Sequence, residues 1–135
     1  MPIQFEYRAD LNCLHAVGEG RLSRQDFLDY HRNITIPDPP PTLLILSDYR
    51  KLDASDLTTS DIEAIRTSAL SRTENKYETV KEALVVSDGL VFGLSRMFDG
   101  VVHSDKYEAG VFTDMNEAKS WLGLPNSFAA EKPFL

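Results

Sequence analysis

Three short apolar segments of this chain each end on a hydroxyl residue that is followed by an aspartate. The segments are residues 43–46 before Ser47 and Asp48, residues 83–86 before Ser87 and Asp88, and residues 110–112 before Thr113 and Asp114. Apolar segments of this length are typical of strands that are buried on both faces, as in a parallel sheet. Because parallel strands end at the same edge of a sheet, the pattern predicts the edge at which ligands of open α/β sheets bind.

The other segments predict an α/β domain around a mixed five-stranded sheet. Alternation at residues 3–8 and an apolar segment at residues 13–17 predict an antiparallel hairpin, whose first strand lies at or near an edge of the sheet. Helical spacing and capping residues predict four helices, which begin after Ser23, at Thr58, Thr59 or Ser60, at Leu90, and after Asp114. The predicted order is β-β-α-β-α-β-α-β-α, and right-handed crossovers make the later strands mainly parallel.

Length and composition narrow the class of protein. The 135 residues fit one domain, residues 1–124, followed by a tail at residues 125–135. The net charge of -7 argues against a nucleic-acid partner. The single cysteine, Cys13, excludes an internal disulfide and favours a cytoplasmic location. No apolar segment approaches the roughly 18 residues of a membrane-spanning helix, so we expect no stable membrane insertion.

Several features together resemble the SpoIIAA-like proteins of the STAS/SEC14-type superfamily. They are the order of elements, a central strand that ends in an acidic residue, a Thr/Ser-rich start to the second helix, and the segments Phe92-Gly93-Leu94-Ser95-Arg96-Met97-Phe98 and Glu117-Ala118-Lys119-Ser120-Trp121-Leu122. The resemblance covers about residues 3 to 124 and implies a SpoIIAA/STAS-like fold in a bacterial protein. It also implies an anti-sigma-factor-antagonist-like or lipid-binding-like role, often without an assigned activity, because fold does not settle function.

The resemblance suggests Ser60 as a phosphorylation site. Anti-sigma-factor antagonists carry a phosphorylatable serine in an Asp-Ser-Ser-Gly segment, which corresponds here to Thr58-Thr59-Ser60-Asp61. A phosphate on Ser60 would gain from the helix amino terminus, but Asp56, Asp61 and Glu63 would repel it. We therefore expect Ser60 to cap the helix rather than to carry a phosphate.

The aspartates at the strand ends suggest a metal site, because converging carboxylates suit a hard cation such as Mg²⁺. Asp88 and Asp114 directly precede predicted helices, where a carboxylate caps backbone N–H groups. Asp48 instead precedes a predicted loop at residues 49–57, beside Tyr49 and Arg50. We expect Asp48 to form a salt bridge with Arg50, and a Mg²⁺-dependent phosphoryl enzyme at Asp48 is the alternative.

No other group of residues predicts catalysis, a metal or a cofactor. His15, His31 and His103 lack the spacing of metal ligands. Cys13 has no neighbouring cation or helix start to lower its pKa, although His15 shares its strand face. The chain has no nucleophile-elbow, phosphate-loop or dinucleotide motif, and we expect Gly93 to be a position of close packing. We therefore predict a protein that is not an enzyme.

The third predicted helix, residues 90–102, is apolar on more than one face. Leu94 lies on the face that we expect to join the core, with Leu90, Met97 and Val101. Phe92 and Arg96 lie on a face that we expect to be exposed, together with the neighbouring Phe98. An exposed aromatic residue beside an arginine is typical of protein interfaces.

The sequence thus predicts a non-enzymatic binding or regulatory domain. We expect it to act through a protein partner or as a homodimer, by contacts of the third helix at Phe92, Arg96 and Phe98 and of the adjoining residues 48–50. An apolar pocket for a small ligand or lipid, as in the SEC14 relatives, is the alternative.

Overall fold

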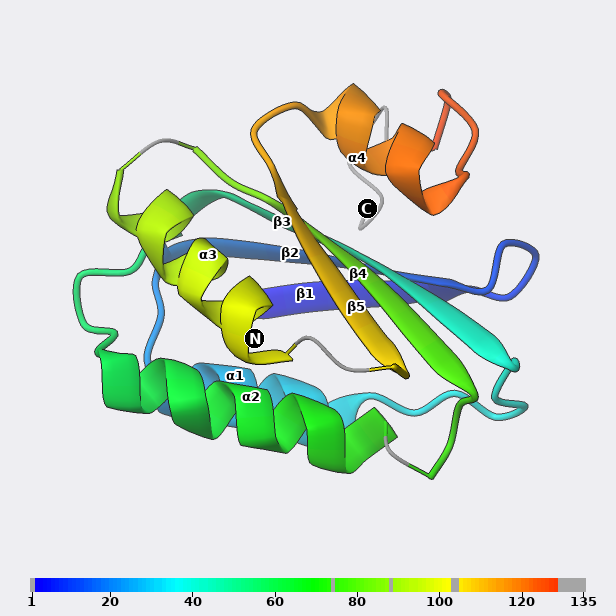
Figure 1. Ribbon diagram of the computed structural model, residues 1–135, viewed down its shortest axis with the longest axis horizontal. Coiled ribbons are helices and arrows are strands. Elements are labelled where there is room, and N and C mark those ends of the chain that lie inside the picture. Colours follow the sequence, from blue (N-terminus) through cyan, green and yellow to red (C-terminus); the bar gives the residue numbers. More distant parts are fainter. Residues whose placement is uncertain (1, 74, 88, 103–104, 129–135) are drawn as a thin grey trace.

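The computed structural model describes residues 2–73, 75–87, 89–102 and 105–128, and for residues 90, 97 and 99–102 it describes the backbone. Within these ranges the elements follow the predicted order (Figure 1). They are β1 (Ile3–Arg8), β2 (Cys13–Arg21), α1 (Arg24–Asn33), β3 (Thr42–Asp53), α2 (Thr59–Thr73), β4 (Thr79–Val85), α3 (Leu90–Val102), β5 (Tyr107–Phe112) and α4 (Met115–Leu122).

The five strands form one sheet in the spatial order β1-β2-β3-β4-β5. β1 lies at one edge and pairs antiparallel with β2, whereas the pairs β2-β3, β3-β4 and β4-β5 are parallel. This confirms the predicted mixed sheet and the edge position of its first strand. Each parallel connection passes through a helix, and these three helices are α1, α2 and α3.

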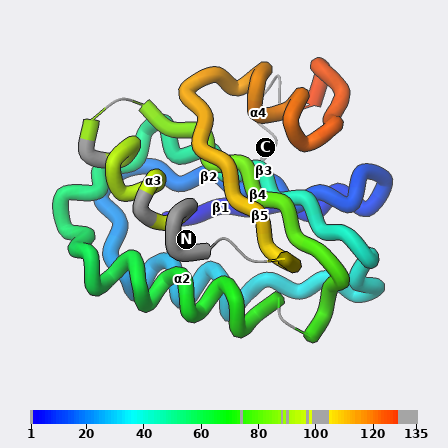
Figure 2. Tube along the Cα trace, in the orientation of Figure 1, coloured from blue at the N-terminus to red at the C-terminus, as the bar shows by residue number. Residues whose placement is uncertain are grey.

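Helices cover both faces of the sheet, as Figures 1 and 2 show, with α1, α2 and α3 on one face and α4 on the other. In β3, Leu43 and Ile45 contribute to the core beneath α1–α3, whereas Leu46 contributes to the core beneath α4. We call these the helix-layer core and the α4 core. Because successive side chains point to opposite faces, a strand buried on both faces has an unbroken apolar sequence.

The second and third strands are longer than predicted. β2 continues past Gly18 to Arg21, with a bulge between Val17 and Glu19, and β3 continues through Asp48 to Asp53. The predicted loop at residues 49–57 is therefore wrong for residues 49–53, because each of these extensions supplies backbone hydrogen-bond partners to the other, whereas residues 54–57 form a loop as predicted. Ser47 and Asp48 consequently lie inside a strand rather than at the sheet edge.

The helix starts confirm two of the predicted caps and correct a third. Ser23 caps α1 in a capping box with Asp26, and the Asp114 carboxylate accepts from the Asn116 N–H at 2.8 Å at the start of α4. At α2 the cap is Thr58, whose hydroxyl accepts from the Asp61 N–H, while its own N–H donates to the Asp61 carboxylate at 2.9 Å. The prediction that Ser60 caps this helix is wrong. The predicted cap Asp88 lies outside the described residues.

The beginning of the tail packs against the domain. Lys119 of α4 is only 3% exposed, and its ammonium donates to the carbonyls of Asn126 and Phe128 at 2.9 and 2.8 Å. The Phe128 ring lies 5.6 Å from the His15 ring between centroids. Residues 125–128 thus close the α4 core over β2.

Two glycine substitutions test how closely side chains pack against Gly18 of β2 and Gly93 of α3. A Cβ on Gly18 would lie 2.9 Å from Cδ1 of the Tyr49 ring and 3.1 Å from Cδ1 of Leu22, whereas a Cβ on Gly93 would meet no atom within 4 Å. The prediction of close packing at Gly93 is therefore wrong. We expect Gly18→Ala to lower the free energy of unfolding by about 1–3 kcal/mol through overpacking. Gly93→Ala should raise it by up to about 1 kcal/mol, because alanine favours a helix.

Urea unfolding followed by circular dichroism measures both effects. Equal effects of the two substitutions would contradict the close approach of Tyr49 to Gly18.

Candidate functional site

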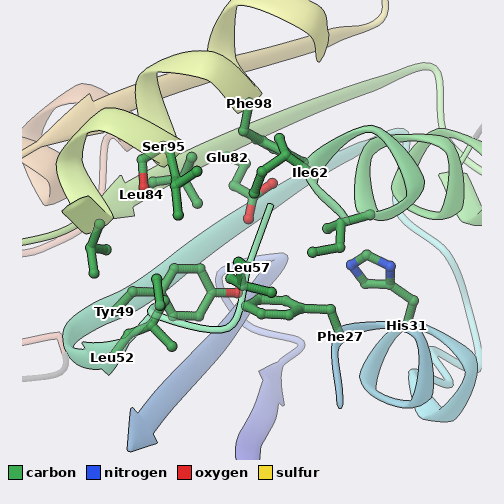
Figure 3. Close-up of a pocket in the computed structure, with 14 residues that line it drawn as sticks. Phe27, His31, Tyr49, Leu52, Leu57, Ile62, Glu82, Leu84, Ser95 and Phe98 are labelled. Atoms are coloured by element: carbon green, nitrogen blue, oxygen red, sulfur yellow. The ribbon is translucent and has the colours of Figure 1, made fainter. Parts of the chain in front are cut away.

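Beside a cavity of about 470 Å³ whose lining includes Leu70, Val80 and Lys106, two cavities that share lining residues lie between the sheet and the layer of α1, α2 and α3. The smaller has a volume of about 50 Å³, and its lining includes Phe27, Tyr49, Leu57, Ile62, Leu84 and Phe98 (Figure 3). The larger has a volume of about 250 Å³, and its lining includes Tyr30, Ile34, Leu43, Ile45, Ala69 and Tyr77. His31 and Glu82 line both cavities, so the two spaces meet at these side chains.

Glu82 is a buried carboxyl at this meeting point. It lies on β4 between Val80 and Leu84, which share its face of the sheet, and it is 7% exposed. Tyr107 of β5 donates to one carboxyl oxygen at 2.6 Å, and Ser47 of β3 donates to the other at 2.8 Å. Figure 3 shows the carboxyl pointing into the small cavity.

The charge of Glu82 has no cationic partner among the described residues, since no lysine or arginine there forms an ion pair with it. Burial raises the pKa of this carboxyl, and the hydrogen bonds from Tyr107 and Ser47 offset only part of that rise. A carboxyl in this setting can accept hydrogen bonds when ionised and donate one when protonated.

Three buried tyrosines lie in the same core. Burial raises the pKa of Tyr30, Tyr49 and Tyr107, and the neighbouring Glu82 raises it further. Their hydroxyls therefore stay protonated at neutral pH. Tyr49 was predicted beside Asp48 in one edge site, but consecutive strand residues point to opposite faces, so Tyr49 lines the small cavity instead.

His31 reaches the cavities from α1. Its Nδ1 lies 2.9 Å from the Ser68 hydroxyl of α2, a contact that joins the two helices and orients the ring. Burial, with a smaller contribution from the Arg72 charge, lowers the pKa of His31 to about 4. The imidazole is therefore neutral at physiological pH, as expected for a histidine at the edge of a core.

Asp48 and Arg50 form the predicted salt bridge, away from the cavities. The Arg50 guanidinium contacts the two Asp48 carboxylate oxygens at 2.9 and 2.8 Å. Burial raises the pKa of Asp48, but the bonds from Arg50 outweigh it and hold that pKa below its ordinary value. In the described residues no group of three or more His, Cys, Asp or Glu side chains is placed to hold a metal ion.

The third helix presents its predicted residues on two different sides. Phe92 is 38% exposed and Arg96 is exposed, as expected, and Leu94 packs against the helix-layer core. Phe98 is 8% exposed and lines the small cavity, so the prediction that it is exposed is wrong. It follows Val91 by seven residues, or two helical turns, and therefore shares the sheet-facing side of α3.

Sequence reasoning missed Glu82, the most unusual residue of the cavities. The apolar segment that predicted β4 began one residue later, at Ala83, and so did not include the glutamate. A signal was present, because period-two spacing places Glu82 on one face with Val80 and Leu84. A carboxyl between two core positions of a buried strand indicates a site or a buried polar network.

Comparison with known proteins supports the fold. No protein-family model and no curated protein sequence matches the chain. The structure is similar to the crystal structure of an uncharacterized protein of the DUF3478 family with a SpoIIAA-like fold, from Shewanella loihica PV-4. The two are 17% identical, with a TM-score of 0.57 over 89% of this chain and 91% of the other. The chain thus has a SpoIIAA-like fold, as predicted, and none of its described helices is long and apolar enough to span a membrane.

The buried carboxyl predicts a pH-dependent gain in stability for Glu82→Gln. Because the pKa of Glu82 is raised in the folded state, wild type loses stability as the pH rises through that pKa. Glutamine keeps the shape without the charge, so at pH 7 we expect it to be more stable by about 1–3 kcal/mol, the cost of an incompletely compensated buried polar group. The difference should shrink toward pH 4. Urea unfolding at both pH values measures it.

Glu108→Gln, at an exposed position of β5, is the matched control, and we expect it to change the free energy of unfolding little at either pH. An equal response of the two variants would show that burial of Glu82 is not the cause.

The lowered pKa of His31 predicts that the folded protein loses stability in acid. Its folded pKa of about 4 lies below its ordinary value, so the unfolded chain binds a proton that the folded chain does not. The contribution of His31 to the free energy of unfolding is therefore fully present above about pH 6.5. It decreases toward pH 4 by up to about 1.4 kcal/mol per pH unit. We expect His31→Gln to flatten the pH dependence of the unfolding free energy over this range. An unchanged slope would contradict the lowered pKa.

Proposed function

We propose that this protein is a non-enzymatic binding domain that holds a small, mainly apolar molecule between the sheet and helices α1–α3. The observation that carries the proposal is Glu82, a carboxyl buried at the meeting point of two cavities without a cationic partner in the described residues. Such a group lowers stability, and residues that oppose folding in this way are expected at functional sites.

The cavities have the chemical character of a small-molecule site. Aliphatic and aromatic side chains form most of their walls, and polar groups occur at fewer positions, among them Glu82, His31 and Tyr107 in the interior and Arg72 and Lys76 at the surface. Ligand pockets are typically concave and apolar, with a few polar groups that fix orientation. The larger cavity supplies most of the volume, and the smaller one extends the space toward α3.

The cavity is better supported than a docking surface on α3. Phe92 is the one large hydrophobic side chain that is exposed in the described part of the chain. Stable protein interfaces bury about 800 Å² on each partner, far more than one aromatic residue supplies. Contact with a protein partner or a second copy through Phe92 and Arg96 stays a prediction, as does a cytoplasmic location.

Filling the larger cavity tests the proposal. Ala69 of α2 lines this cavity and is buried, whereas Ala64 of the same helix lies outside both cavities. We expect wild type to bind the neutral fluorophore N-phenyl-1-naphthylamine, with chemical-shift changes at the methyl groups of Leu43 and Ile45. Ala69→Leu should weaken binding at least roughly tenfold, equivalent to about 1.4 kcal/mol. Ala64→Leu should bind as wild type does.

Thermal unfolding establishes that each variant is folded before titration. Equal binding by the two variants, or shifts confined to the exposed face of α3, would place the fluorophore elsewhere and refute the proposal.

A further inference from the structure

The mouth of the larger cavity carries two positive charges. Arg72 and Lys76 line the cavity at exposed positions, near the edge at which β3 and β5 begin. Neither forms an ion pair within the described residues. Among the described residues of this lining the one carboxyl is the buried Glu82, so the exposed charges that they place at the mouth are cations, in a chain of net charge -7.

The end of α2 brings these cations together. Arg72 lies in the last turn of the helix, and the Lys76 N–H donates to the Thr73 carbonyl at 3.2 Å, which folds the chain back after the helix. The carboxyl end of a helix carries partial negative charge that one cation offsets. Arg72 serves that purpose, and Lys76 adds positive charge at the same mouth.

The wall below the two cations is apolar. Ile34 and Ile36 follow α1, and Leu43 and Ile45 face the cavity from β3. An exposed cationic mouth above an apolar wall matches a molecule with an anionic head and an apolar chain.

Resting on the proposed function, we propose that the bound molecule is an amphiphile with a carboxylate head, which Arg72 and Lys76 bind at the mouth while its chain fills the larger cavity toward Glu82. The guanidinium of Arg72 can hold both oxygens of a carboxylate. An amine head seated against Glu82 fits less well. Each Glu82 oxygen already accepts a hydrogen bond, and an amine would have to pass two cations to enter.

Ligands with the same chain and different heads separate the alternatives. We measure the binding of decanoate, decanol and decyltrimethylammonium to the full chain by titration calorimetry at low and high salt. Decanoate should bind up to roughly tenfold more tightly than decanol, since exposed charge contacts contribute a factor of up to about five each. This preference should diminish at high salt because ions screen exposed charges. Decyltrimethylammonium should bind most weakly.

Charge-matched double variants test the two cations. Arg72→Gln with Lys76→Gln should bind decanoate roughly tenfold more weakly and decanol as wild type does. Arg32→Gln with Lys51→Gln removes the same charge at exposed residues outside both cavities and should leave decanoate binding unchanged.

The outcomes distinguish this inference from the function on which it rests. Equal affinity for decanoate and decanol, or no effect of the Arg72 and Lys76 substitutions, would overturn the carboxylate head while leaving an apolar-ligand site intact. Binding of none of the three ligands, together with no binding of N-phenyl-1-naphthylamine, would overturn both.

Discussion

The hydrogen bonds to the Glu82 carboxyl connect the three strands on which the site depends. Ser47 and Tyr107 reach this carboxyl from the strands on either side of β4, so a single buried acid joins β3, β4 and β5 on the face beneath α1–α3. Two neutral donors satisfy its oxygens without neutralising its charge. The helix-layer core therefore contains a polar centre, and both cavities border it.

The buried charged groups on the two faces of the sheet have different surroundings. On the α4 face, the Lys119 ammonium is buried but satisfied by two backbone carbonyls, and it holds residues 125–128 over the sheet. On the opposite face, α2 packs against α1 and α3, and cavities remain beneath this layer. The proposed site thus lies on the face that retains cavities, opposite the α4 core.

Local sequence predicted the parts of the fold that depend on local physics. The caps at Ser23 and Asp114 follow from side chains a few residues from the backbone groups that they satisfy. The continuation of β3 through Asp48 could not be predicted in this way, because its polar residues are ordered by pairing with β2. Phe98 was misplaced because its proximity to Phe92 in sequence hid their positions on different sides of α3.

By itself, the sequence determined the order of the elements and the mixed sheet, because apolar periodicity and right-handed crossovers are properties of the chain. The SpoIIAA-like fold was predicted from the resemblance of its segments to that family. Only the tertiary structure decided where binding chemistry gathers. Ser47 is 35 residues from Glu82 in the sequence, and Tyr107 is 25 residues from it. His31 lies on a further element, α1. Strand register and the packing of α1 and α2 bring these groups to the same cavities, and no local pattern encodes that distance.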